Sequence, residues 1–272
     1  MIITDLSSDT ADPGLLEAVF ERVLRPSFST DELPDFAYLL NGFNVGQVVS
    51  VATMEGQVIG AGVASSQANS QASSPTEGAG DGAANSQADG AANRAAGVTG
   101  KRGEDISLLH YLAISPDARS GGIGGAILDH MLKRWRRLGT GLALAEIHDP
   151  RFHAETTDEK PLARARFYAK HGGELLDVAW VQPALADGSD PVDGMLLVAL
   201  HRSGMFAGER LPSAPILAMA DGYFGTASDS SDAFPASEPN SVPAALRERL
   251  DQPDGIRVLR LLDFDKVEPL TD

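Results

Sequence analysis

A run of glycines lies between a predicted buried strand and a predicted helix. The strand ends at Ile114, the helix reaches Leu138, and the run consists of Arg119, Ser120, Gly121, Gly122, Ile123, Gly124 and Gly125. Glycine at a helix start leaves the backbone open, so several unpaired N–H groups can converge on one anion at the positive end of the helix dipole. Arg119 adds a permanent charge with a fork of donors suited to phosphate oxygens. The pattern favours a pyrophosphate ligand.

Two other interpretations of the glycines compete with this one. They could form a tight turn that allows close helix packing. They could also belong to a nicotinamide or flavin dinucleotide fold, in which Glu146 would stand where a ribose-binding acid is expected. The spacing opposes the second interpretation, since a G-x-G-x-x-G pattern from Gly122 requires glycine at Ile127. In that fold the glycine turn also follows its strand at once, whereas here several residues intervene.

Hydrophobic periodicity predicts the elements that must position this loop. Ile127, Met131 and Trp135 recur at helical spacing, and Leu108 to Ile114 reads as a strand buried on both faces. The further helices are expected at Pro13 to Leu24 with Asp12 as N-cap, Asp31 to Leu40, Pro161 to Lys170 and Ala244 to Leu250. The further strands are expected at Ile2 to Leu6, Val48 to Met54, Val58 to Ala64, Leu142 to Ile147, Leu175 to Trp180, Met195 to Leu200 and Ile256 to Leu262.

A low-complexity stretch interrupts this pattern. From Ser65 to Gly100 the chain is rich in Ser, Gln, Ala, Asn and Gly, and Val98 is its one large aliphatic residue. Such a stretch cannot form a core, and long flexible insertions in a loop destabilise a fold little. We therefore expect an inert, disordered insertion over 65–104 within a domain of residues 1–200. Residues 201–272 form an extension of unknown role, which could join the sheet or cover a substrate site.

Composition narrows the class of protein. The chain has 272 residues, a formal charge of −16 and no cysteine. Cysteine chemistry is therefore excluded, and the acidic balance opposes binding to nucleic acid. The first residues lack the basic and apolar regions of a secretory signal, and no apolar run is long enough to cross a bilayer. We expect a cytoplasmic protein without a membrane or nucleic-acid partner, either a monomer or a homodimer.

Two motifs together resemble the Gcn5-related N-acetyltransferase (GNAT) superfamily. The first is Leu112-Ala113-Ile114-Ser115-Pro116 followed by Arg119-x-x-Gly122-x-Gly124, which is similar to the acetyl-CoA motif of that family. The second is the run from Ala165 to Gly172, which contains the Phe167-Tyr168 pair before a glycine. The resemblance covers roughly Ile2 to Leu200 and is strongest from Leu108 to Gly172.

The resemblance implies an α/β fold with a mixed sheet, whose central parallel strands splay apart around acetyl-CoA. The backbone of Leu112, Ala113 and Ile114 would bind the pantetheine arm and the thioester carbonyl. The loop from Arg119 to Gly125 would hold the pyrophosphate. Tyr168 matches the tyrosine that often protonates the departing thiolate, although it could also be a core aromatic residue.

The motifs also depart from the family pattern. Pro161 stands where an asparagine is frequent, Gly173 stands where a phenylalanine is usual, and Leu108 stands where some members carry a glutamate base. A base must therefore come from elsewhere, because the attacking amine has to lose a proton. Glu146, near the end of its strand, is the first candidate.

His110 is the second candidate base, although a core histidine bonded to backbone is the more ordinary interpretation. Strict alternation would place Leu108, His110, Leu112 and Ile114 on one face, and Leu142, Leu144, Glu146 and His148 on one face of the next strand. His148, Asp149 and His153 form too weak a pattern for a metal site, so no metal is expected. Asp31 and Glu32 could bind an amine or could simply be solvated acids at a helix start.

The sequence thus predicts an enzyme that transfers acetyl from acetyl-CoA directly to a primary amine of a small molecule or peptide. A catalytically idle acyl-CoA-binding or regulatory module is the alternative, because the strand glutamate is missing. The acceptor is not specified by the sequence.

Overall fold

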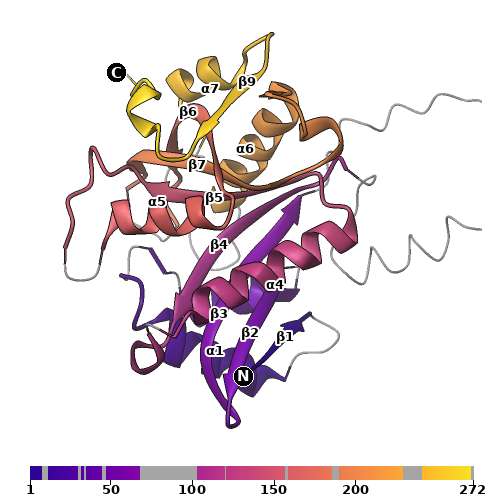
Figure 1. Ribbon diagram of the computed structural model, residues 1–272, viewed down its shortest axis with the longest axis vertical. Helices are drawn as coiled ribbons and strands as arrows, with labels where there is room; N and C mark the ends of the chain where they lie inside the picture. Colours follow the sequence, from indigo (N-terminus) through magenta and orange to yellow (C-terminus); the bar gives the residue numbers. More distant parts are fainter. Residues whose placement is uncertain are drawn as a thin grey trace, which may run out of the picture.

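A mixed sheet of nine strands forms the centre of the molecule (Figure 1). The computed structural model describes residues 1–7, 12–29, 32–33, 35–44, 47–67, 103–119, 121–156, 159–185, 190–228 and 241–270. The strand order is β1-β2-β3-β4-β5-β7-β6-β9-β8. The strands are β1 (Ile2–Leu6), β2 (Val48–Met54), β3 (Gln57–Gln67), β4 (Ile106–Ile114), β5 (Leu142–His148), β6 (Glu174–Gln182), β7 (Val192–Arg202), β8 (Arg210–Leu211) and β9 (Ile256–Arg260).

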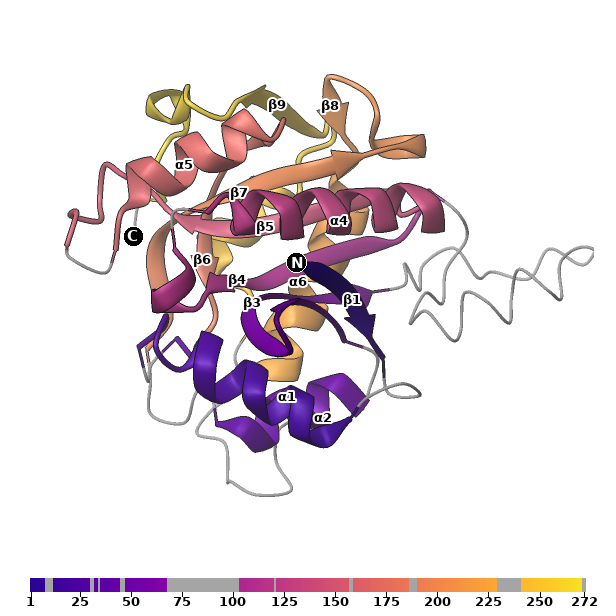
Figure 2. The ribbon, with the colours of Figure 1, turned by 60° about the horizontal axis from the view of Figure 1, so that its bottom comes forward.

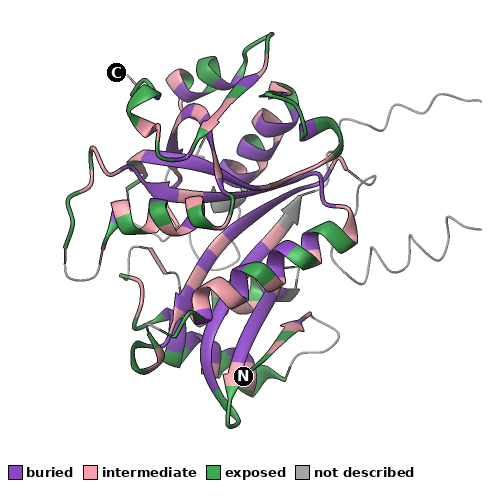
Figure 3. Cartoon of the chain, in the orientation of Figure 1, coloured by how far each residue is buried: buried purple, intermediate pink, exposed green. Residues whose placement is uncertain are grey.

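Helices cover both faces of this sheet, as the turned view shows (Figure 2). One face carries α4 (Ile123–Leu138) and α5 (Pro161–Lys170), whose apolar residues pack together in one cluster. The opposite face carries α1 (Pro13–Val19) and α2 (Phe36–Asn44) over the amino-terminal strands. It also carries α6 (Ser213–Ser228) and α7 (Ala244–Leu250) over the carboxyl-terminal strands. The central strands are buried along most of their length because they are covered twice (Figure 3).

Local chemistry explains the limits of two of these helices. At α1, Asp12 caps the helix by accepting a hydrogen bond from the Gly14 amide at 2.9 Å, and the chain continues as a π-helical turn over Phe20–Leu24. At α4, Gly122 precedes the first turn with φ 70° and Gly139 follows the last with φ 75°. Both are left-handed conformations that favour glycine.

The two central strands separate along their length. β4 and β5 are parallel and pair only from Ile106 with Leu142 to Leu109 with Ala145. Beyond these positions β4 continues to Ile114 against β3, and β5 continues to His148 against β7. The backbones therefore diverge toward their carboxyl ends, which confirms the mixed α/β sheet with splayed central parallel strands that the sequence predicted.

A β-bulge at His110 overturns the expected alternation in β4. Val63 of β3 pairs with Tyr111 and Ala64 pairs with Leu109, so His110 is the extra residue. As a result Leu108 packs with the α6 cluster, whereas Leu112 and Ile114 pack with the α4 cluster. The prediction that Leu108, His110, Leu112 and Ile114 share one face was wrong, because one inserted residue reverses the side-chain period.

Three other segments differ from the sequence predictions. β3 runs to Gln67, into the stretch assigned to the insertion, because Ser65, Ser66 and Gln67 pair with Leu108, Ser107 and Ile106 through backbone bonds that need no apolar side chains. The second helix covers Phe36–Asn44 and not Asp31 to Leu40. Helix α6 was not predicted. Residues 68–102, which hold most of the low-complexity stretch, lie outside the described residues.

The extension beyond residue 200 joins the same sheet. β9 pairs antiparallel with β6 from Glu174 with Arg260 to Leu176 with Val258. α6 and α7 close the apolar cluster on that side of the sheet. Among the described residues, no helix has both the length and the apolar character needed to span a bilayer.

Candidate active site

The glycine loop lies at the carboxyl end of β4, as expected. A 3₁₀ turn over Pro116–Ala118 links the strand to Arg119, which is exposed. Gly121 and Gly122 are exposed, and a Cβ built on Gly122 meets no atom within 4 Å. Ser120 lies outside the described residues. The loop therefore presents open backbone beside a positive side chain.

The first turn of α4 offers donors to this open space. The bond from the Ala126 amide to the Gly122 carbonyl measures 3.1 Å and starts the helical ladder. The preceding amides, those of Ile123, Gly124 and Gly125, are the ones that an α-helix leaves without an intrahelical acceptor. The macrodipole adds a partial positive charge at the same end. This geometry suits an anion such as a diphosphate.

The backbone of Leu112, Ala113 and Ile114 borders the gap between the splayed strands. On one side these residues pair with Gly62, Ala61 and Gly60 of β3. On the other side β5 has already diverged, so its described pairs with β4 end at Leu109. The edge of β4 that faces β5 is thus unpaired with β5 from Leu112 to Ile114, where an extended ligand could bond to its backbone.

Tyr168 lies on α5, on the face of β5 that α4 also covers. Its ring is buried, contacts Phe167 at a centroid distance of 5.2 Å and belongs to the same apolar cluster as Ile147. Burial raises the pKa of the Tyr168 hydroxyl to about 12. The group therefore stays protonated at physiological pH, which is the state that a general acid requires.

Two glycines close α5 directly after Tyr168. Gly172 has φ 83°, and the Gly173 amide donates to the Tyr168 carbonyl at 2.8 Å. A Cβ at Gly173 would lie 2.9 Å from that carbonyl oxygen. Glycine at position 173 therefore has a steric reason, because only glycine fits beneath the helix end.

Glu146 lies on the opposite side of β5, at the first residue beyond the pairing with β4. Gln182 donates to its Oε2 at 3.1 Å, Tyr223 donates to the same oxygen at 2.9 Å, and Trp180 donates to Oε1. Burial raises the pKa of Glu146, and these three donors partly oppose the rise because they stabilise the ionised form. A carboxyl group whose pKa is raised in this way is, once ionised, a stronger base than an exposed glutamate.

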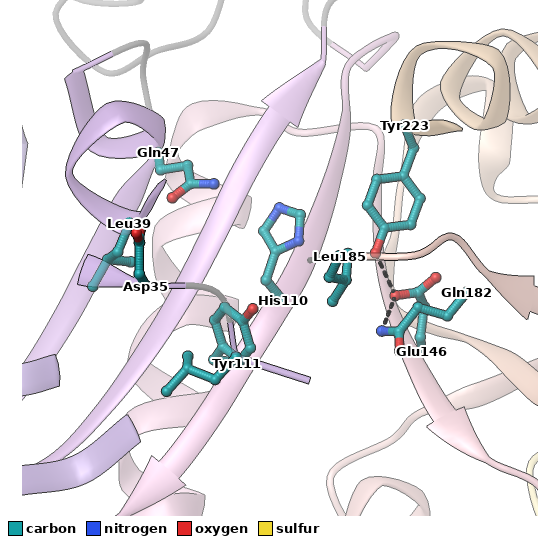
Figure 4. A pocket seen from close by; sticks show the side chains of 10 residues that line it. Asp35, Leu39, Gln47, His110, Tyr111, Glu146, Gln182, Leu185 and Tyr223 are labelled. Atoms are coloured by element: carbon teal, nitrogen blue, oxygen red, sulfur yellow. Dashed lines mark hydrogen bonds between the residues drawn. The ribbon is translucent and has the colours of Figure 1, made fainter. Parts of the chain in front are cut away.

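A pocket opens between Glu146 and the amino-terminal half of the molecule (Figure 4). The cavity volume within its walls is about 20 Å³. It lies at the divergence of β4 and β5, on the face away from α4 and α5. The lining residues are Leu33, Asp35, Leu39, Gln47, His110, Tyr111, Glu146, Gln182, Leu185 and Tyr223.

His110 faces this pocket, and the bulge brings the next residue, Tyr111, to the same side. Its Nε2 lies 2.7 Å from Ser65 Oγ, and its ring centroid is 6.0 Å from that of Tyr223. Burial lowers the pKa of His110 to about 4, so the ring is neutral at physiological pH. The expected backbone partner is replaced by the Ser65 side chain.

A group of one histidine and two glutamates lies at the end of β5. The Nδ1 of His148 is 2.5 Å from Glu159 Oε2, and the ligand atoms of His148, Glu159 and Glu32 lie within 4.8 Å of one another. Glu159 also pairs with Arg164 at 3.1 Å, and His153 bonds to the Asp193 carbonyl. These partners fit an ion-pair network. The expectation that no metal binds here stays a prediction. Asp31 lies outside the described residues.

Sequence reasoning proposed Glu146 and Tyr168 but missed the three donors around the Glu146 carboxylate. Trp180 and Gln182 follow on β6, and Tyr223 comes from α6, 77 positions after Glu146. The alternation of β6 could have indicated Trp180 and Gln182 as residues of one face. Nothing in the sequence links Tyr223 to β5.

Comparison with known proteins gives similarities of structure only. No family model and no curated protein matches the chain. A protein described as a GNAT-family acetyltransferase, from Bacteroides thetaiotaomicron, overlaps with a TM-score of 0.48 at 17% identity, covering 75% of this chain and 88% of its own. The ribosomal-protein-S18-alanine N-acetyltransferase of Escherichia coli gives 0.44 at 15% identity, covering 77% and 99%.

The aminoglycoside 6'-N-acetyltransferase of Enterococcus faecium overlaps with a TM-score of 0.42 at 16% identity, covering 75% of this chain and 99% of its own. The TM-scores and the sequence identities of these three proteins are all low. The function of the chain is therefore inferred below from its own residues.

Proposed function

We propose that this chain is a GNAT-superfamily enzyme that transfers acetyl from acetyl-CoA directly to a primary amine of a small molecule or peptide. The observation that carries the proposal is the divergence of β4 and β5 immediately beside the glycine-rich start of α4. A diphosphate on the first-turn amides would direct the attached pantetheine along the free edge of Leu112 to Ile114. The thioester would then reach the gap between the strands.

The two candidate catalytic groups lie on opposite faces of β5. In the proposed reaction the amine nitrogen attacks the thioester carbonyl carbon from the pocket side, and Glu146 accepts the amine proton directly or through a water molecule. As the C–S bond breaks, the Tyr168 hydroxyl donates its proton to the sulfur. The products are an amide and CoA with a free thiol, and no acyl-enzyme intermediate is needed.

An isosteric pair of variants tests the cofactor site. Gly122→Asn and Gly122→Asp both tolerate the left-handed backbone, and they differ only in charge. A unit charge about 6 Å from a diphosphate in nearly aqueous surroundings is repelled by about 1.4 kcal/mol, so the dissociation constant of CoA should rise about tenfold more in Gly122→Asp than in Gly122→Asn. Calorimetry with purified protein measures both constants. Equal CoA affinity in the two folded variants would refute the proposed diphosphate position.

Turnover separates the enzyme from the idle acyl-CoA-binding module. Wild-type protein with acetyl-CoA and a panel of primary amines should release free thiol in step with amide formation. CoA binding without turnover on any amine would favour the idle module.

A further inference from the structure

Charged groups are distributed unevenly around the pocket beneath Glu146. Two of the lining residues, Asp35 and Glu146, are carboxylic acids, and none of the described lining residues is lysine or arginine. The one other titratable base, His110, is neutral at physiological pH because burial lowers its pKa to about 4. A ligand therefore meets two carboxyl groups and, among the described lining residues, no fixed positive charge.

The partners of Glu146 reinforce this bias. Its three hydrogen-bond donors, Trp180, Gln182 and Tyr223, are all uncharged. An approaching ammonium group would stabilise the ionised form of this carboxylate, whereas a second carboxylate would be repelled by it. Arg164, the cation of the neighbouring His148 group, is paired with Glu159 and does not line the pocket.

The remaining walls are apolar or aromatic. Leu33, Leu39 and Leu185 line the pocket, and the rings of Tyr111 and Tyr223 stand on either side of His110 (Figure 4). Aromatic faces attract organic cations, and leucine side chains favour a hydrocarbon body. The formal charge of −16 on the whole chain also favours the approach of a cation.

We infer that the acceptor is a small cationic alkyl- or arylalkylamine that carries no carboxylate beside its amino group. This inference rests on the proposed function and adds the class of acceptor. The pocket would thus select amines over the amino acids of the same side chain. A carboxylate about 7 Å from a pocket acid, at an effective dielectric constant of about 20, should lower kcat/KM about 30-fold or more.

Matched acceptors test the inference on the full chain. Phenethylamine, phenylalaninamide and phenylalanine share one side chain, but only the last carries a carboxylate, and isopentylamine, leucinamide and leucine form a second set. We expect transfer to the amines and to the neutral amides, with kcat/KM about 30-fold or more below them for the amino acids. In Asp35→Asn this preference should fall several-fold. It should persist in Glu17→Gln, which removes the same charge at an exposed position of α1 outside the pocket.

Binding to the CoA-loaded protein, measured by calorimetry, separates the two ways of failing. If the amino acids are acetylated as well as the amides, the acceptor class is wrong and the transferase function stands. If nothing is acetylated but phenethylamine binds while phenylalanine does not, the class stands and the transferase function falls. If no acceptor is acetylated and none binds, the inference is overturned.

Discussion

The hydrogen bond from Tyr223 to Glu146 should set part of the pH dependence of the reaction. The bond is 2.9 Å long and its donor ring is buried, so Tyr223→Phe removes the hydroxyl without removing the ring. A hydrogen bond to an ionised group contributes about 1.5–3 kcal/mol and one to a neutral group about 0.5–1.5 kcal/mol. The difference, about 1.4 kcal/mol, corresponds to a rise of about one unit in the pKa of Glu146.

The direction of the effect follows from the proposed role of Glu146 as base. The carboxylate is active when ionised, so a higher pKa reduces kcat/KM on the acidic side of the pH profile and leaves the plateau at higher pH nearly unchanged. The assay is kcat/KM for acetyl transfer to phenethylamine from about pH 5 to about pH 9. Phe224→Leu is the matched control, because Phe224 is buried beside Tyr223 but has no hydroxyl to donate to the carboxylate. If Tyr223→Phe lowers activity equally at every pH, Glu146 is not the group that titrates.

Three further predictions concern other parts of the chain. Tyr168→Phe should lower kcat about 100-fold with unchanged CoA affinity, since general acid catalysis contributes about that factor; unchanged kcat would remove Tyr168 from the mechanism. The pKa of His110 falls from 6.5 to about 4 on folding, because burial disfavours the charged ring. Below about pH 6.5 the unfolded chain binds a proton at His110 that the folded chain does not, so the free energy of unfolding should fall by about 2 kcal/mol between about pH 7 and pH 5. In His110→Gln, urea unfolding should show a correspondingly smaller decrease. Deleting residues 70–100 should leave the urea midpoint and CoA binding unchanged. Deleting residues 66–99 should lower the midpoint, because it removes the backbone pairs of Ser66 and Gln67 with β4. Equal midpoints in the two deletions would show that these pairs add nothing to the free energy of unfolding.

Periodicity in the sequence was sufficient to predict the elements around the glycine loop. The repeated apolar residues of α4 are buried where the pattern places them, and Gly122 begins the helix in the left-handed conformation. The Leu142 to Ile147 strand was predicted to within one residue. These signals are local, so the sequence alone contains them.

The bulge at His110 and helix α6 could not be found in the same way. A bulge is a matter of register against β3, which the alternation of β4 alone does not reveal. α6 combines Pro215, Gly222 and Gly225 with apolar residues on several sides, since it packs into a cluster with β6, β7 and α7. Its pattern therefore lacks the single apolar stripe of a surface helix.

The same limit applies to the candidate site. Glu146 was proposed from its place at a strand end, but its pKa is raised by burial and lowered by donors from β6 and α6. Their positions depend on tertiary packing, which a one-dimensional pattern does not encode.

The contact of α6 with β5 also has a consequence for the order in which a ribosome makes this protein. The glycine loop and β5 emerge first, and Tyr223 follows 77 residues after Glu146. Domains generally fold from the amino terminus during synthesis. A nascent chain released before α6 would therefore carry the glycine loop without a complete pocket at Glu146, so the two proposed substrate sites would mature at different times.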